Sequence, residues 1–206
     1  MNEDLKNPAR SPREDAVLIR AFQGGDKAAF DELVLKHQHN LFNLCYRFLG
    51  DYQEANDSAQ EAFIKVYRSL KGFRFESAFS TWLYRIAVNT SKNKLKSAEY
   101  RRRKRMVPLD NPASPEHGSP AMGIQDDAPS PLMELEKEER MRLIQEAVSA
   151  LPPEQKEVVA LRDIEGFSYE EIVEITGLNP GTVKSRLARA RLELRKRLRS
   201  VISHEL

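Results

Sequence analysis

Apolar residues recur every three or four positions along most of this chain, and no stretch alternates with period two. This spacing predicts amphipathic helices. The longest such run covers about five turns and ends before Gly50; its members are Phe30, Leu33, Val34, His37, Leu41, Leu44, Cys45, Phe48 and Leu49. A shorter run predicts a helix over 15–23, another run ends at Gly72, and helices resume from Leu132. We therefore expect an all-α protein.

Four polar residues stand where helix N-caps are expected, each just before an apolar run. A short polar side chain at this position accepts a hydrogen bond from an amide of the first turn, which has no partner within the helix. Asp51 and Glu54 resemble a capping box, and Ser168 with Glu171 forms a complete one. Ser80 is expected to cap a helix that begins at Thr81. Asn179 precedes a proline at the first helical position, so it caps the last helix.

The last forty residues predict a helix-turn-helix. A short helix opens at Ser168, Gly177 lies in the break, and the helix after Asn179 has an apolar stripe at Val183, Leu187, Ala190, Leu194 and Leu198. Its other faces carry eight Lys and Arg against one acid between residues 184 and 199, a net charge of +7. Such a helix fits the DNA major groove. The alternative is a solvated surface helix or a coiled-coil segment, but those faces usually mix charges of both signs.

Composition changes abruptly between the two helical parts. Residues 106–131 hold six of the eleven prolines and four acids but no Lys or Arg. A segment of this kind cannot form a core and predicts an extended linker. We therefore expect a loose N-terminal arm at 1–13, a first helical domain at 14–105, this Pro-rich acidic linker, and a second helical domain at 132–206.

The overall charge and the reactive residues narrow the function classes. The 206 residues carry a formal net charge of only +2, which hides strong local segregation. The one cysteine, Cys45, excludes an internal disulfide and is expected as a buried thiol. The four histidines form no metal-ligand spacing with it. No catalytic set and no cofactor motif is found, so neither an enzyme nor a cofactor is expected. No apolar run approaches the length of a membrane span, which favours a cytoplasmic location.

A second candidate nucleic-acid surface follows from residues 73–105. Five of the sixteen aromatic residues lie between positions 73 and 84, and residues 85–105 carry a net charge of +8. Aromatic rings stack on unpaired bases, and Lys side chains such as Lys92 and Lys94 contact phosphates. Phe73 and Phe75 are the candidates for exposure, because Phe79, Trp82 and Tyr84 could instead fill the core. The basic run at 101–105 could equally be a solvated surface.

Three sets of motifs, in order along the chain, resemble bacterial sigma factors. Residues 50–67 resemble the polymerase-binding helix of that family, and residues 79–89 resemble its melting and minus-ten region. Leu151-Pro152, residues 169–172 and residues 181–191 resemble its minus-thirty-five recognition motif. The resemblance covers about residues 14–105 and 132–199. With two domains and no middle one, the chain is similar to extracytoplasmic-function (ECF) sigma factors, close to the envelope-stress sigma-E type.

This resemblance implies roles for particular residues. Core RNA polymerase would be contacted by Asp57, Gln60, Glu61 and Phe63, although Phe63 could also be a core residue. Single-stranded minus-ten DNA would be bound by Phe73, Asn89, Lys92 and Lys94. The bases of the minus-thirty-five element would be contacted by Lys184, Ser185, Ala188 and Arg189. The DNA backbone would be contacted by Arg162, Tyr169, Gly181, Thr182, Arg186 and Arg191.

The resemblance also implies partners. They are the largest and second-largest subunits of core RNA polymerase, promoter DNA in duplex and single-stranded form, and an anti-sigma factor that could hold the protein at the inner membrane. Two other functions stay open on the residues alone. One is a freestanding helix-turn-helix regulator, and the other is a DNA-processing enzyme such as a recombinase.

Overall fold

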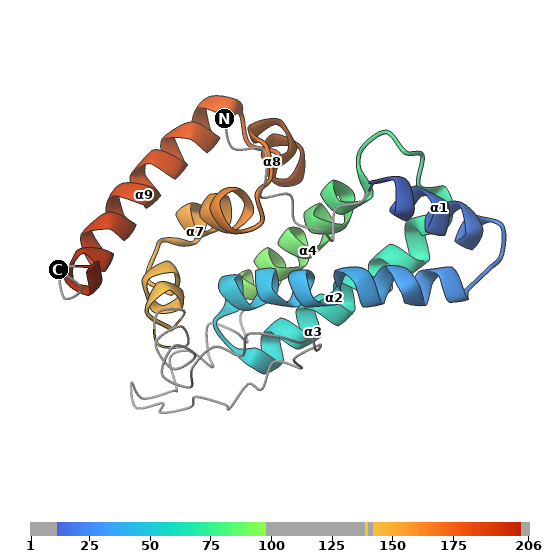
Figure 1. The fold of residues 1–206 in the computed structure, drawn as a ribbon, viewed down its shortest axis with the longest axis horizontal. Coiled ribbons are helices and arrows are strands. Elements are labelled where there is room, and N and C mark those ends of the chain that lie inside the picture. The colour runs from blue at the N-terminus through green and yellow to red at the C-terminus, as the bar shows by residue number, and fades with distance from the viewer. Residues whose placement is uncertain (1–11, 98–138, 140–141, 203–206) are drawn as a thin grey trace, which may run out of the picture.

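The structure, a computed structural model, describes residues 12–97, 139 and 142–202, with side chains to residue 199, and every regular element in that part of the chain is helical. The N-terminal domain contains α1 (Pro12–Gln23), α2 (Ala28–Leu49), α3 (Tyr52–Ser69), the 3₁₀ turn η1 (Leu70–Gly72) and α4 (Phe79–Lys96). The C-terminal domain contains a helical stretch at 142–149, α7 (Pro153–Val159), the π-helical turn η2 (Ala160–Ile164), α8 (Tyr169–Thr176) and α9 (Pro180–Ile202). The expected all-α fold is confirmed (Figure 1).

Several predicted features lie outside the described residues. They are most of the N-terminal arm, the basic run at 101–105, the Pro-rich linker at 106–131 and the last four residues. The arm was expected to extend to residue 13, but α1 already begins at Pro12, three residues before the predicted start at Asp15. A proline at the first position of a helix loses nothing by lacking an N–H group, which explains the earlier start.

The predicted helix ends are mostly confirmed. The Asp51 side chain accepts a hydrogen bond from the amide of Glu54 at 2.8 Å, and Ser168 with Glu171 forms both bonds of a capping box. Asn179 Oδ1 accepts from the amide of Thr182 at 2.7 Å. Gly50 adopts the left-handed conformation that often ends a helix, at φ 70°.

The predicted cap at Ser80 is wrong. Helix α4 begins at Phe79, its N-cap residue Ala78 makes no side-chain hydrogen bond, and Ser80 is buried within the first turn. The side chain of Phe79 is also buried. We attribute the earlier start of α4, at Phe79 and not at Thr81, to the packing of the Phe79 ring in the core.

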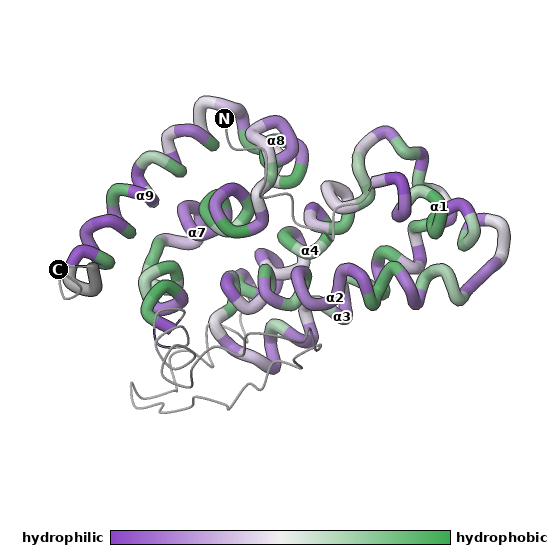
Figure 2. The backbone as a smooth tube through the Cα atoms, viewed as in Figure 1, coloured by the Kyte–Doolittle hydropathy of each residue, from purple (hydrophilic) through white to green (hydrophobic). Residues whose placement is uncertain are grey.

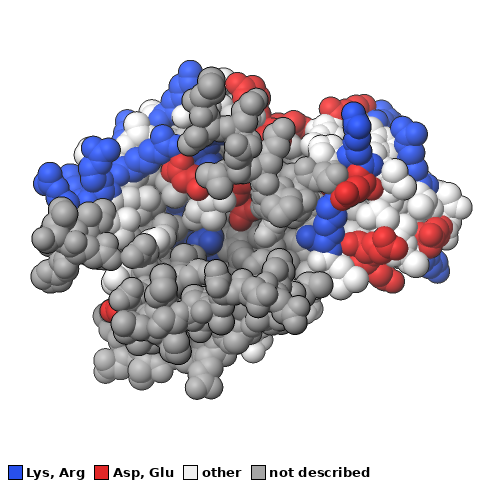
Figure 3. Space-filling model, viewed as in Figure 1, with Lys and Arg blue, Asp and Glu red and all other residues white. Residues whose placement is uncertain are grey.

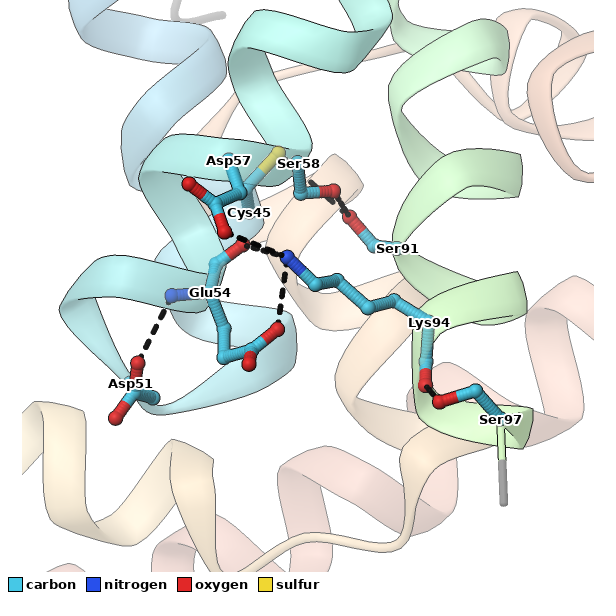
Figure 4. Close-up of polar contacts among 8 residues, drawn as sticks. All are labelled: Cys45, Asp51, Glu54, Asp57, Ser58, Ser91, Lys94 and Ser97. Atoms are coloured by element: carbon cyan, nitrogen blue, oxygen red, sulfur yellow. Dashed lines mark hydrogen bonds and ion pairs between the residues drawn. The ribbon is translucent and has the colours of Figure 1, made fainter. Parts of the chain in front are cut away.

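The N-terminal core lies between α1, α2, α3 and α4. Helix α1 is joined to α2 by a buried polar cluster, in which Asp15 lies 3.2 Å from His37 Nε2 and 2.8 Å from Lys36 Nζ. Burial acts to raise the pKa of Asp15, but the hydrogen bonds from His37 and Lys36 outweigh it and lower the pKa overall. Cys45 is fully buried, as expected, and Ser91 lies against it and against Ser58 (Figure 4).

The C-terminal core is smaller and is built by the predicted apolar stripes. Ile172 and Ile175 of α8 pack with Val183 and Leu187 of α9 and with the buried residues of α7 and η2. Along helix α9, hydrophobic positions recur between hydrophilic ones (Figure 2), and its basic residues other than Arg186 are exposed. Its exposed faces therefore carry the basic side chains, and α7 and α8 lie between α9 and α4 (Figure 1).

The two domains pack against each other, so that their buried apolar residues form one continuous cluster. We call the contact of α2 and α4 with the C-terminal helices the domain interface. Tyr84 of α4 donates a hydrogen bond to Glu165 Oε2 at 2.7 Å, and its ring contacts Phe167 edge-to-face. Lys92 Nζ lies 2.6 Å from the buried carboxylate of Glu157. The sequence pattern indicated neither this arrangement nor these pairs.

Candidate nucleic-acid interface

The N-terminal half of α9 presents four exposed side chains on one side. Val183, Leu187 and Ala190 are buried against the rest of the domain. The helix therefore turns its predicted base-contacting residues to solvent, and all of them are exposed: Lys184, Ser185, Ala188 and Arg189. The first turns of a recognition helix are the part that reaches base edges in helix-turn-helix proteins. The basic face of this helix is prominent in Figure 3.

Apart from Arg186, the predicted backbone-contacting residues fall into two groups. Gly181 is exposed and Thr182 is half-buried at the N-terminus of α9, where the helix dipole favours phosphate; the amide of Thr182 already donates to Asn179 Oδ1. The other group is engaged within the protein. Arg162 donates to the carbonyl of Phe167 at 2.7 Å and lies over the ring of Tyr169, and Arg191 Nε donates to Asp163 at 3.1 Å.

Arg186 differs from the other basic residues of α9, because it is half-buried. Its positive charge acts on Glu157, together with the closer charge of Lys92. Burial nevertheless dominates and raises the pKa of Glu157 above the ordinary glutamate value. Arg186 therefore belongs in part to the electrostatics of the domain interface.

The aromatic residues at 73–82 form a cluster at the start of α4. Ring centroids of Phe73 lie 5.0 Å from Trp82, 5.1 Å from Phe75 and 6.2 Å from Phe79. Phe79 is buried, Phe73 and Trp82 are half-buried, and Phe75 is exposed. The expected exposure is thus found for Phe75 and only partly for Phe73.

The predicted DNA-binding residues of α4 have different surroundings. Asn89 is exposed. Lys92 is held by Glu157 across the domain interface, and its side chain is 32% exposed. Lys94 is held by α3, because its Nζ lies 2.7 Å from the carboxylate of Glu54 and 3.4 Å from that of Asp57 (Figure 4). These acids lie 35 or more positions away in the sequence, so a local pattern could not indicate the pairs.

The predicted polymerase-contacting residues lie on α3. Asp57, Gln60 and Glu61 are exposed, whereas Phe63 is half-buried and packs against the core cluster. The large apolar side chain exposed beside them is Ile64, at 50%. Its position off the buried stripe of Ala55, Ala59, Ala62 and Val66 was a usable signal for this exposure.

The described residues hold neither a metal-binding cluster nor a membrane-spanning helix. Within the described ranges, no group of three or more His, Cys, Asp or Glu side chains is placed to hold a metal ion. No described helix is both long and apolar enough to cross a membrane. A helix-turn-helix with a basic outer face, together with an aromatic loop beside an exposed asparagine, instead defines a helical nucleic-acid-binding protein.

Comparison with known proteins identifies the family within this class. Sigma-70 region 2 matches residues 33–105, and Sigma-70, region 4 matches residues 141–194. The chain is 41% identical over 191 residues to the RNA polymerase sigma-H factor of Pseudomonas aeruginosa, covering 92% of this chain and 96% of the relative. It is 38% identical over 188 residues to the ECF RNA polymerase sigma-E factor of Escherichia coli K12, covering 91% and 96%.

Two solved structures share the fold. CnrH in complex with the cytosolic domain of CnrY matches with a TM-score of 0.63 and 22% identity, over 91% of this chain and 98% of that one. The sigma factor RpoE from Bartonella quintana, in complex with the anti-sigma factor NepR, matches with a TM-score of 0.63 and 24% identity, over 82% and 96%. The chain belongs to the sigma-70 family, in its ECF branch, and is a transcription initiation factor. Of the functions that the residues alone left open, the comparisons support the sigma factor.

Proposed function

We propose that this sigma factor binds two elements of a promoter while it is bound to core RNA polymerase. Helix α9 occupies the major groove of the minus-thirty-five element, and the loop before α4, with Asn89, holds an unpaired minus-ten base. The observation that carries the proposal is the pairing, on one chain, of a helix suited to duplex DNA with an exposed aromatic and amide surface suited to a single strand.

Within α9 we assign base contacts to the exposed residues of the first turns, Lys184, Ser185, Ala188 and Arg189. Arginine can donate two hydrogen bonds to guanine, and the small Ala188 can make only an apolar contact, for example with a thymine methyl group. Gly181, Thr182 and Arg186 contact phosphates. Arg162, Tyr169 and Arg191 also hold their own domain together, so their contribution to DNA binding is partly to position α9.

For polymerase binding we assign the outer face of α3. Asp57, Gln60 and Glu61 form a polar rim beside the exposed Ile64, an arrangement typical of protein interfaces. This face would bind the largest subunit, and the second-largest subunit is the other proposed polymerase partner. We further propose a cytoplasmic protein that is controlled by an anti-sigma factor, in keeping with the RpoE–NepR complex among the proteins of the same fold.

The packed domains cannot make both DNA contacts at once. The minus-ten and minus-thirty-five elements are about 25 base pairs apart, which is about 85 Å at 3.4 Å per pair. Helix α8 contacts both α4 and α9, and the axes of packed helices lie about 8–10 Å apart, so near α8 the axes of the two DNA-binding helices are at most about 20 Å apart. The domains must therefore separate on the promoter. The 41 residues at 98–138 can span about 135 Å when fully extended, which is sufficient.

A transcription and footprinting experiment tests the proposal. Wild-type holoenzyme, assembled from purified core polymerase and the full chain, first selects promoters from a randomised library by run-off transcription. On a selected promoter, protection of both elements should require core polymerase. Arg189→Ala should lose about 1–3 kcal/mol of binding, mainly on promoters with the selected minus-thirty-five sequence. Lys196→Ala, farther along the same helix, is the matched control.

Two outcomes would contradict this assignment. If the free chain protected a promoter as well as the holoenzyme does, the protein would act as an operator-binding regulator. If Arg189→Ala weakened binding equally on every minus-thirty-five sequence, Arg189 would contact phosphate and not a base.

A further inference from the structure

A cavity of about 300 Å³ lies where the turn between α1 and α2 meets the C-terminal end of α3 and η1. This end of the N-terminal domain is the one farthest from α9 (Figure 1). Small-molecule sites in proteins begin at about this volume. None of the residues predicted to contact DNA or polymerase lines the cavity, whose walls are formed by Phe22, Gly25, Lys27, Tyr67, Arg68 and Lys71.

Aromatic rings form the apolar wall of the cavity. Phe22 is buried, whereas Tyr67 is 42% exposed. The ring of Tyr67 makes two edge-to-face contacts, at 5.3 Å from the centre of the Phe22 ring and 5.0 Å from that of Phe30. These contacts fix the orientation of the ring while part of its surface stays open to solvent. The wall therefore offers an aromatic surface on which a planar group can stack.

Three cationic side chains line the same cavity, and no acidic side chain lines it. Lys27 comes from the turn before α2, Arg68 from α3 and Lys71 from η1. In the described part of the chain none of the three makes an ion pair, whereas Lys36 and Lys94 each pair with two acids. Like charges around one cavity repel each other, so entry of an anion is favourable there.

The two sides of the cavity are fixed relative to each other by α1. The side-chain amide of Gln23, near the end of α1, donates to the carbonyl of Leu70 at 3.2 Å and to that of Phe73 at 2.9 Å. Gly25 has a φ of 108°, a conformation that other residues rarely adopt, and its turn brings Lys27 to the cavity. The aromatic wall and the backbone that carries the cations are therefore preformed.

We infer that this cavity binds a free nucleoside di- or triphosphate, with the base against Tyr67 and the phosphates among the three cations. Arg68 presents a fork of N–H donors that matches phosphate oxygens, and Lys27 and Lys71 add compact positive charges. An acidic segment of a protein partner would match the cations but would leave the aromatic wall unused. Such a site is independent of the proposed function, because it shares no residue with the proposed DNA or polymerase contacts.

Titration of the isotopically labelled full chain with ATP, followed by NMR, tests the site. The backbone amides of Gly25, Lys27 and Tyr67 should shift and should saturate at one nucleotide per chain. Adenosine, which lacks the phosphates, and inorganic triphosphate, which lacks the base, should each bind more weakly than ATP. Added salt should weaken ATP binding, because the cationic side chains are exposed and their charges are screened.

Variants separate the contributions of charge and ring. Arg68→Gln with Lys71→Gln should weaken ATP binding by about 5- to 30-fold, since two exposed ion pairs with phosphate are lost. The matched control, Arg195→Gln with Lys196→Gln, removes the same two kinds of charge from α9 and should leave the binding unchanged. Tyr67→Ala should weaken it by about 5- to 150-fold, and Tyr67→Phe, which keeps the ring, should bind as wild type does. Thermal unfolding of each variant shows whether the fold is kept.

Three results would overturn the inference. The first is that ATP shifts none of these amides. The second is that inorganic triphosphate binds as tightly as ATP, which would make the cavity a simple anion site. The third is that Arg68→Gln with Lys71→Gln weakens binding of core polymerase or of single-stranded DNA but not of ATP, because the cations would then belong to a macromolecular interface. The ATP titration uses neither polymerase nor promoter, so its failure would leave the proposed function standing.

Discussion

The hydrogen bond between Tyr84 and Glu165 offers a quantitative test of domain packing. It joins α4 to the loop after η2 at 2.7 Å, and both residues are almost fully buried, with 2% and 6% exposure. The Tyr84→Phe substitution removes only the hydroxyl group. The ring remains, so its edge-to-face contact with Phe167, at 4.8 Å between centroids, is kept.

The expected magnitude follows from the chemistry of this pair. A hydrogen bond to a charged group contributes about 1.5–3 kcal/mol, because the ionised acceptor strengthens it. When the domains separate, water can hydrogen-bond to Glu165 in place of the Tyr84 hydroxyl. Removing the hydroxyl therefore destabilises the packed arrangement but not the separated one. At about 1.4 kcal/mol per factor of ten, Tyr84→Phe should lower the ratio of packed to separated molecules by about 10- to 150-fold.

Energy transfer between two dyes measures this ratio. The chain has one cysteine, Cys45, which is fully buried, so cysteines introduced at the exposed positions Glu32 and Lys196 can be labelled selectively. Urea, added below the concentration that unfolds either domain, should separate the domains at a lower midpoint in Tyr84→Phe than in wild type. Tyr67→Phe, in an exposed tyrosine of α3, is the matched control. Identical midpoints in all three proteins would refute this account of the domain interface.

Although Tyr84→Phe should weaken the packing of the domains, it should strengthen binding to the promoter. If only separated domains can span both promoter elements, the apparent affinity for the promoter equals the intrinsic affinity multiplied by the fraction of molecules whose domains are separated. Tyr84→Phe raises that fraction and should therefore strengthen holoenzyme binding to promoter DNA. A weaker or unchanged affinity, with a shifted urea midpoint, would show that separation of the domains does not limit binding.

Two further predictions concern Glu157 and Ser168. Burial raises the pKa of Glu157 in the packed arrangement, so its stabilising contribution is full below the ordinary glutamate pKa and is lost as the pH rises through the raised value. Domain packing, measured by the same energy transfer, should therefore strengthen as the pH falls from neutral, and Glu157→Gln should remove this dependence. Ser168→Ala should destabilise the C-terminal domain by about 1 kcal/mol, since it removes the cap bond to the amide of Glu171, and Ser168→Thr should restore most of it. Thermal unfolding followed by circular dichroism checks this, and equal midpoints for wild type and Ser168→Ala would contradict it.

Local signals in the sequence predicted local structure well. The caps at Asp51, Ser168 and Asn179 were correct, because a cap depends on two residues about three positions apart. The exposed face of α9 was also correct, because the apolar spacing of one helix determines which side is buried. The cap at Ser80 was wrong, since burial of Phe79 decided where α4 begins.

The contacts of the predicted site residues were indicated less completely by the sequence than the helices were. The resemblance indicated Lys92 and Lys94 as DNA-binding residues, but each is held by acids from distant parts of the chain. The left-handed conformation of Phe75 and its support by Gln23 were not indicated by any pattern. These partners are 40 to 65 positions apart in the sequence and meet only after the helices have packed, so such contacts cannot be inferred from periodicity.

The sequence by itself determined the helices, the helix-turn-helix, the basic face of α9 and the family, because each depends on residues close together in the chain or on motifs in a set order. Only the tertiary structure decided which charges are paired, which aromatic ring reaches the surface, and how the two domains pack. The domain interface illustrates the physical reason. Tyr84 and Glu165 are 81 positions apart, and their hydrogen bond stabilises the protein only once packing has buried both groups next to each other.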